Sequence, residues 1–149
     1  MIKIELNRVQ GDYGFEAKDA AGHIVNIDAA EATGGLGAGV RPMQLLLMGL
    51  GGCSGIDIIS ILKKQRQTVE NLSIKIEGER ESGGEPSLWK AVTIVFEFTG
   101  NIDIMKAQKA CDLSMEKYCS VAETLRRGGT QLNWEVRVGN ENRAIINSQ

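Results

Sequence analysis

Alternating apolar and polar residues predict short β-strands over the first 30 residues of the chain. The alternation is clearest in residues 2–6, and turns at Gly11 and Gly22 separate it from two further apolar segments, residues 13–17 and 23–27. This pattern predicts a small antiparallel meander.

A long apolar segment follows and predicts a buried helix. Pro42 suits the first helical position, where a missing N–H costs nothing, and the helix should run to about Arg66, with Gly51 and Gly52 as a point at which it could kink. The segment is long enough to suggest a membrane span, but it contains Asp57, and a lone carboxylate is costly in lipid. A core helix is therefore the favoured interpretation.

The second half of the chain predicts two strands, a helix and a final strand. Residues 72–76 and 92–98 alternate as two arms of an antiparallel hairpin. A second long helix should begin after a cap at Asn101 or Asp103 and end near Arg127, where Gly128 follows. Residues 132–138 alternate again, and the polar tail after them is expected to be frayed.

The order of elements predicts an α+β fold in a single domain over residues 1–149, because no repeated βαβ unit is present. A chain of 149 residues with 42% hydrophobic residues can bury a core.

A net charge of -2 gives no electrostatic reason to expect nucleic acid or an anionic membrane as a partner. The charges near Met1 interrupt any signal peptide, so a cytoplasmic location is expected.

The chemistry of the chain centres on its cysteines. Three cysteines, one histidine and no Cys-x-x-Cys motif indicate neither a secreted disulfide framework nor a zinc site. Cys53 lies among small residues in the apolar helix, where it is either a reactive thiol, if the helix breaks before it, or an inert core residue. If the second helix is continuous, Cys111 and Cys119 are roughly 12 Å apart along it and cannot bridge each other. Cys53 can then pair with either, and local sequence does not separate the two.

A glycine-rich loop over residues 34–39 suggests a phosphate cradle at the start of the long helix. The loop lacks the Lys-Ser/Thr pair of a P-loop, and the preceding strand ends too early for a dinucleotide fingerprint. A phosphate site is therefore the weaker interpretation, and no cofactor is expected.

Two segments resemble the OsmC/Ohr family, most closely its YhfA-type branch. Residues 41–57, RPMQLLLMGLGGCSGID, resemble the helix with the first active-site cysteine, and residues 112–122, DLSMEKYCSVA, resemble the segment with the second. The resemblance implies an intertwined homodimer with two long central helices per subunit, enclosed by antiparallel sheets from both chains. It also implies that Cys53 attacks an organic hydroperoxide, that Cys119 resolves the product and that Cys111 is structural. No metal or organic cofactor is implied, and an external dithiol regenerates the pair.

One departure from the family pattern concerns activation of the thiol. In peroxide-reducing members a glutamate follows the helix-opening proline and pairs with an arginine, whereas here Met43 and Gln44 follow. Arg8 and Arg41 are the remaining candidates for a positively charged partner of the Cys53 thiolate, so slow reaction with peroxide is expected.

Alternatives to a peroxidase are a structural dimer and a module that binds an apolar ligand at the dimer interface. Apolar walls for either a peroxide or a ligand are offered by Met43, Leu46, Leu47 and Met48.

Overall fold

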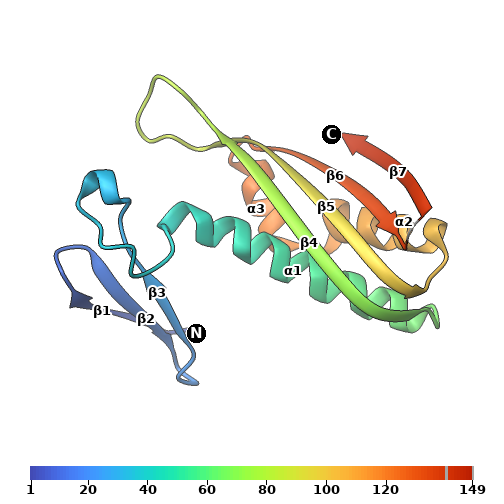
Figure 1. The fold of residues 1–149 in the computed structure, drawn as a ribbon, viewed down its shortest axis with the longest axis horizontal. Helices are drawn as coiled ribbons and strands as arrows, with labels where there is room; N and C mark the ends of the chain where they lie inside the picture. Colours follow the sequence, from blue (N-terminus) through green and yellow to red (C-terminus); the bar gives the residue numbers. More distant parts are fainter. Residues whose placement is uncertain (140, 149) are drawn as a thin grey trace. The chain divides into compact units, whose positions relative to one another are not determined.

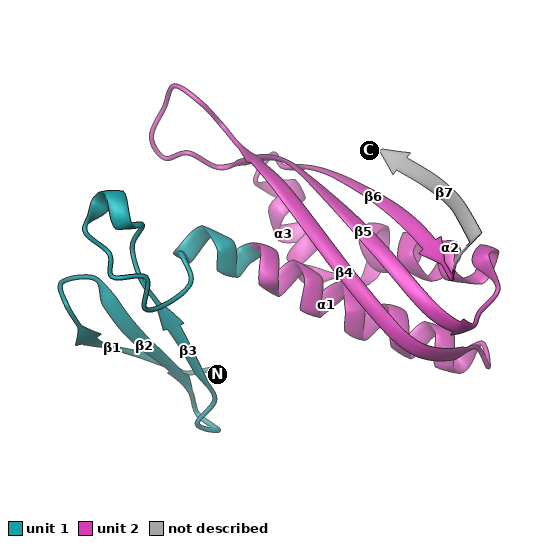
Figure 2. Ribbon diagram, viewed as in Figure 1, with its two compact units in different colours: residues 1–46 teal, residues 47–149 magenta. Residues whose placement is uncertain are grey.

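A computed structural model describes residues 1–139 together with the backbone of residues 141–148. Two compact units make up the chain, residues 1–46 and residues 47–149 (Figure 2). The single domain expected from the sequence stays a prediction.

The first unit contains the expected meander. Strands β1 (Ile4–Gln10), β2 (Gly14–Asp19) and β3 (Ile24–Ile27) pair antiparallel in sequence order. The 3-10 helix η1 (Glu31–Thr33) follows, and Gly34 ends it with a φ of 106° that favours glycine.

The glycine-rich loop folds around a carboxylate of the chain itself. Asp28 is 2% exposed and accepts hydrogen bonds from the backbone N–H groups of Ala29, Leu36 and Ala38 at 2.8, 2.9 and 3.1 Å. The bonds from Ala38 and Leu36 are the main cause that lowers the pKa of Asp28. Because these amides bind Asp28, they are not available to a phosphate.

The second unit is built on a four-stranded sheet in the order β4-β5-β6-β7. Its strands are β4 (Thr68–Arg80), β5 (Trp89–Asn101), β6 (Gln131–Val138) and β7 (Glu141–Ser148). The predicted hairpin is confirmed, because β4 and β5 pair antiparallel. β5 and β6 pair parallel, and the helical crossover between them lies over the same face of the sheet as α1 (Pro42–Lys64) (Figure 1). The tail expected to fray forms β7, which pairs with β6.

The core of the second unit lies between the sheet and its helices. Alternate side chains of β5 and β6 are buried: Val92, Ile94, Phe96, Phe98, Leu132, Trp134 and Val136. This is the period of two expected for a sheet with one covered face. The indole N–H of Trp134 donates to Asp112 Oδ1 at 2.9 Å, which joins the sheet to a helix.

Helix α1 is continuous through Gly51 and Gly52 and buries every fourth residue on one face: Leu50, Ser54, Ile58 and Leu62. A Cβ atom at Gly51 would lie 3.0 Å from Ile76, and one at Gly55 would lie 3.0 Å from Ile74, so glycine allows α1 to approach β4 closely. By length and composition alone α1 could cross a membrane. One face of α1 packs against the sheet, and 28% of its apolar window is buried.

The second helical segment differs from the prediction of one long helix. Helix α2 (Ile104–Leu113) begins with Asp103, whose carboxylate accepts from the N–H groups of Met105 and Lys106. A π-helical turn, η2 (Ser114–Tyr118), follows, Cys119 adopts an extended conformation, and α3 (Ser120–Arg127) then begins. The expectation of a continuous helix from Asp103 to Arg127 is therefore wrong.

Candidate functional site

The first part of the site is one face of α1. Cys53 and Asp57 are four residues apart on this helix, so their side chains project from the same face one turn apart. Both side chains are half-buried. The carboxylate of Asp57 is oriented by Ser114, whose hydroxyl donates to Oδ2 at 3.1 Å.

The second part of the site is the break before α3. Cys119 is the N-cap of α3, and its Sγ accepts a hydrogen bond from the backbone N–H of Ala122 at 3.4 Å. The carbonyl of Met115 in the preceding π turn accepts from the guanidinium of Arg126 at 2.7 Å. A cysteine at a helix N-terminus was the arrangement considered for Cys53, and the structure places Cys119 there instead.

These two elements bring three functional groups together. The sulfur atoms of Cys53 and Cys119 and a carboxylate oxygen of Asp57 all lie within 4.8 Å of one another. Cys119 is 3% exposed, and all three cysteines of the chain are free thiols. A disulfide bond has an S–S length of about 2.05 Å, so the two sulfurs must approach further to form one.

Burial keeps Cys119 protonated. Loss of solvent, with a smaller contribution from neighbouring Cys53, raises the pKa of Cys119 to about 12, although the N–H of Ala122 acts in the opposite direction. Burial also raises the pKa of Cys111, which is fully buried on α2. Both thiols are therefore neutral at physiological pH.

Alkylation of Cys119 should be slow at neutral pH and should accelerate well above pH 9. With Cys53 and Cys111 replaced by serine, burial still holds the pKa of Cys119 in the folded protein above the ordinary thiol value of 9.0, so the thiolate fraction stays small. By the same linkage, Cys119 contributes stability that is present below about pH 9 and is lost as pH rises toward its folded pKa.

The measurement is the rate of iodoacetamide labelling of this variant as a function of pH. The same variant unfolded in urea is the control and should show the midpoint of an ordinary thiol. A folded-state midpoint at or below that of the unfolded control would contradict the burial argument.

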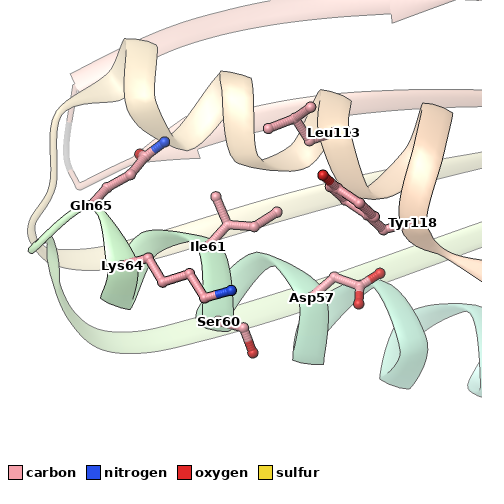
Figure 3. Close-up of a pocket in the computed structure, with 7 residues that line it drawn as sticks. All are labelled: Asp57, Ser60, Ile61, Lys64, Gln65, Leu113 and Tyr118. Carbon is pink, nitrogen blue, oxygen red and sulfur yellow. The ribbon is translucent and has the colours of Figure 1, made fainter.

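An open cavity of about 520 Å³ lies next to this cluster, between α1 and the α2–η2 segment (Figure 3). Its lining residues are Asp57, Ser60, Ile61, Lys64, Gln65, Leu113 and Tyr118. Asp57 is thus shared between the cysteine cluster and the cavity, whereas neither cysteine lines the cavity.

The structure brings together two of the residues singled out from the sequence and adds a third. Cys53 and Cys119 meet, whereas Cys111 is not part of the cluster. Asp57 was not predicted as a site residue, although its spacing of four residues from Cys53 on a helix was a usable signal.

Two further expectations concern the surroundings of the thiols. The cavity beside the cluster is lined by residues further along α1 than Met43, Leu46, Leu47 and Met48. Those four residues were expected to line a pocket at a dimer interface, which stays a prediction. Arg8 and Arg41 belong to the first unit. Within residues 47–139, no lysine, arginine or histidine forms an ion pair with Asp57.

Comparison with known proteins identifies the family of the chain. The sequence profile of the OsmC-like protein family matches residues 34–135. The chain belongs to this family. It is 38% identical to Protein YhfA of Escherichia coli strain K12 over 115 residues, which cover 76% of the chain and 81% of the relative. The resemblance inferred from the two cysteine segments is confirmed.

Solved structures show the same fold. A hypothetical protein from Aquifex aeolicus VF5 is 29% identical, with a TM-score of 0.77, covering 94% of this chain and 98% of that one. The organic hydroperoxide resistance protein OsmC from Legionella pneumophila, also described as a predicted redox protein, is 18% identical with a TM-score of 0.72, covering 93% and 97%. The α+β class predicted from the order of elements is therefore confirmed.

Proposed function

We propose that the protein is a thiol-based redox enzyme that reduces organic hydroperoxides through Cys53 and Cys119. The observation that carries the proposal is the approach of the two sulfur atoms to within 4.8 Å from separate helical elements. Membership of the OsmC-like family supports it, as does the description of the Legionella pneumophila relative as an organic hydroperoxide resistance protein.

Exposure supports a division of roles between the two thiols. Cys53 is half-buried and accessible to a small molecule, whereas Cys119 is 3% exposed and its pKa is raised to about 12 by burial. An attacking thiol must reach the peroxide as a thiolate, while a resolving thiol needs only to reach its partner. Cys53 is therefore the attacking residue and Cys119 the resolving one.

The reaction consists of three balanced steps. The Cys53 thiolate attacks one peroxide oxygen, the O–O bond breaks, the alkoxide leaves and takes up a proton as the alcohol, and Cys53 becomes a sulfenic acid. The Cys119 thiol then displaces the sulfenic oxygen, which gives a disulfide and water. An external dithiol reduces the disulfide by exchange and is itself oxidised. This cycle requires no cofactor and suits a cytoplasmic protein.

Asp57 is a candidate acceptor of the Cys119 proton in the second step. Its carboxylate is within 4.8 Å of both sulfurs and is held by the Ser114 hydroxyl. A negative charge there does not stabilise the Cys53 thiolate in the first step, since like charges repel. We therefore expect resolution to be assisted and the initial attack to be slow.

Steady-state consumption of cumene hydroperoxide with dithiothreitol as reductant tests the function. Many turnovers per chain are expected, at a rate above that of dithiothreitol alone and proportional to protein concentration. Consumption that stops after one equivalent, or that does not exceed the reductant background, would contradict a peroxidase.

The cavity beside Asp57 favours a second candidate, the binding of a small ligand without turnover. Its volume of about 520 Å³ lies within the range of ligand pockets, and it combines apolar walls with the charged groups of Asp57 and Lys64. In this function the cysteines are incidental. Saturable binding of a small amphipathic molecule with no consumption of peroxide would favour it over the redox proposal.

The same proposal includes a homodimer, because a single chain leaves apolar residues of α1 uncovered. Met48 is 54% exposed, Ile56 71% and Ile59 36%. An apolar stripe of this kind on a core helix is typical of a surface that a second chain covers.

Sedimentation equilibrium should therefore give twice the chain mass at micromolar concentration. Ile56→Glu should shift the population toward monomer, because a carboxylate placed in an apolar interface is costly. Gln131→Glu is the matched control, since it adds the same charge to an exposed polar position on β6, outside the apolar stripe of α1. A stable wild-type monomer would contradict the dimer.

A further inference from the structure

The cysteine cluster also has the donor set of a metal site. Two thiols and a carboxylate meet with their donor atoms within 4.8 Å of one another. Within residues 47–139 Asp57 forms no ion pair with a basic side chain, so no protein cation occupies the cluster. Cysteine sulfur and carboxylate oxygen are donor atoms that a divalent cation such as Zn²⁺ accepts.

The geometry points to a binding site for one thiophilic divalent cation, Zn²⁺, held by Cys53 Sγ, Cys119 Sγ and a carboxylate oxygen of Asp57 in the reduced protein. This site is independent of the proposed peroxidase activity, although it uses the same sulfurs.

The separations fit tetrahedral zinc after small side-chain movements. Zn–S bonds of about 2.3 Å and Zn–O bonds of about 2.0–2.2 Å place neighbouring ligand atoms roughly 3.5–3.8 Å apart. The observed upper limit of 4.8 Å is about 1 Å larger, which rotamer adjustment can supply. Cys53 and Asp57 face the ion from one helix, and Cys119 faces it from the break before α3.

Two further groups hydrogen-bond to the proposed ligands, as second-sphere residues do around metal sites. The Ser114 hydroxyl donates to Asp57 Oδ2 at 3.1 Å, which fixes the carboxylate and leaves its second oxygen for a metal bond. The Ala122 N–H donates to Cys119 Sγ at 3.4 Å and supports negative charge on that sulfur. Thiolate ligands select Zn²⁺ over Mg²⁺ and Ca²⁺, which prefer oxygen.

Three protein ligands leave a fourth position for water or another small ligand. Asp57 lines the open cavity of about 520 Å³, which provides a path for the ion and for that fourth ligand. The site also requires both thiols to lose their protons, so binding should release protons and weaken as pH falls.

Metal binding and disulfide formation exclude each other, because they use the same sulfurs. Oxidation of the zinc form by an organic hydroperoxide joins the two thiolates in a disulfide and breaks the O–O bond. Two protons are consumed, and the products are the alcohol, water and free Zn²⁺. Peroxide should therefore release the ion in a one-to-one ratio with the disulfide formed.

Titration of the reduced, metal-free protein with Zn²⁺ under anaerobic conditions, against a chromogenic chelator, tests the site. One Zn²⁺ per chain is expected, and Co²⁺ in its place should give the near-ultraviolet charge-transfer absorption of a thiolate–cobalt bond. Ser114→Ala, which keeps all three ligands, should weaken Zn²⁺ binding about 10-fold. Asp57→Ala should weaken it further, and Cys53→Ser or Cys119→Ser should remove the absorption.

Cys111→Ser is the matched control and should bind Zn²⁺ and Co²⁺ as the wild type does, because Cys111 is not in the cluster. The inference is overturned if the wild type binds no zinc, or if Cys119→Ser and Asp57→Ala bind it as tightly as the control. Peroxide consumption measured in chelator-treated protein is a separate readout. Turnover without zinc binding overturns only the metal site, and zinc binding without turnover overturns only the peroxidase.

Discussion

Cys53→Ser is expected to reduce peroxide consumption to the background rate of the reductant. A serine hydroxyl is not ionised at neutral pH and is a poor nucleophile toward the O–O bond, so the first step of the cycle is lost. The measurement is the steady-state rate with cumene hydroperoxide and dithiothreitol. Full multi-turnover activity of Cys53→Ser would assign the attack to another residue.

Cys119→Ser should behave differently from Cys53→Ser. It keeps the attacking thiol, so one equivalent of peroxide should be consumed rapidly and a sulfenic acid should remain on Cys53, where dimedone can trap it. Cys111→Ser is the control for both variants, since Cys111 is fully buried and is not part of the cluster. A normal rate in Cys119→Ser would show that an external thiol resolves Cys53 directly.

Phe96→Ala should lower the free energy of unfolding by about 3–5 kcal/mol. Phe96 is fully buried on β5, where it pairs with Ile74 of β4 and Val136 of β6 at the centre of the sheet. Its removal leaves a cavity between the sheet and the helices that the surrounding side chains fill only partly.

Urea denaturation at one fixed protein concentration is the appropriate measurement, because association would add a concentration-dependent contribution to stability. Phe96→Leu is the matched control and should cost less than about 1.5 kcal/mol, since it keeps most of the buried volume. Equal losses for the two variants would contradict close packing around the ring.

The regular parts of the fold could be predicted from the sequence because they follow the pattern of apolar residues. Alternation in residues 92–98 identified the central strand and its buried face, and both are present in β5. Both β4 and β5 extend beyond the predicted residues at each end. Hydrogen bonding between paired strands also orders residues that lack the alternating pattern. The start of α1 at Pro42 followed from the properties of proline alone.

The break at Cys119 could not be predicted, because no glycine or proline occurs in residues 101–127. The π turn is held instead by contacts to distant residues. The Ser114 hydroxyl donates to Asp57, and the Arg126 guanidinium donates to the carbonyl of Met115. These interactions exist only after α1 and α3 have each packed against the π turn, so they leave no local pattern.

The site was predicted in part for the same reason. The family resemblance identified Cys53 and Cys119, but residue context alone left Cys111 and Cys119 equivalent as partners for Cys53. Asp57 was read as an argument against a membrane span and not as a group of the site. Its contribution depends on the approach of Cys119 from another element, and spacing along one helix does not reveal that approach.

The most direct test is a count of thiols in reduced, metal-free Cys111→Ser protein before and after one equivalent of cumene hydroperoxide. The account predicts a fall from two free thiols per chain to none, with peptide mapping that finds a disulfide between Cys53 and Cys119 of the same chain. Two thiols remaining after the peroxide is added, or a disulfide that joins Cys53 of one chain to Cys53 of another, would contradict it.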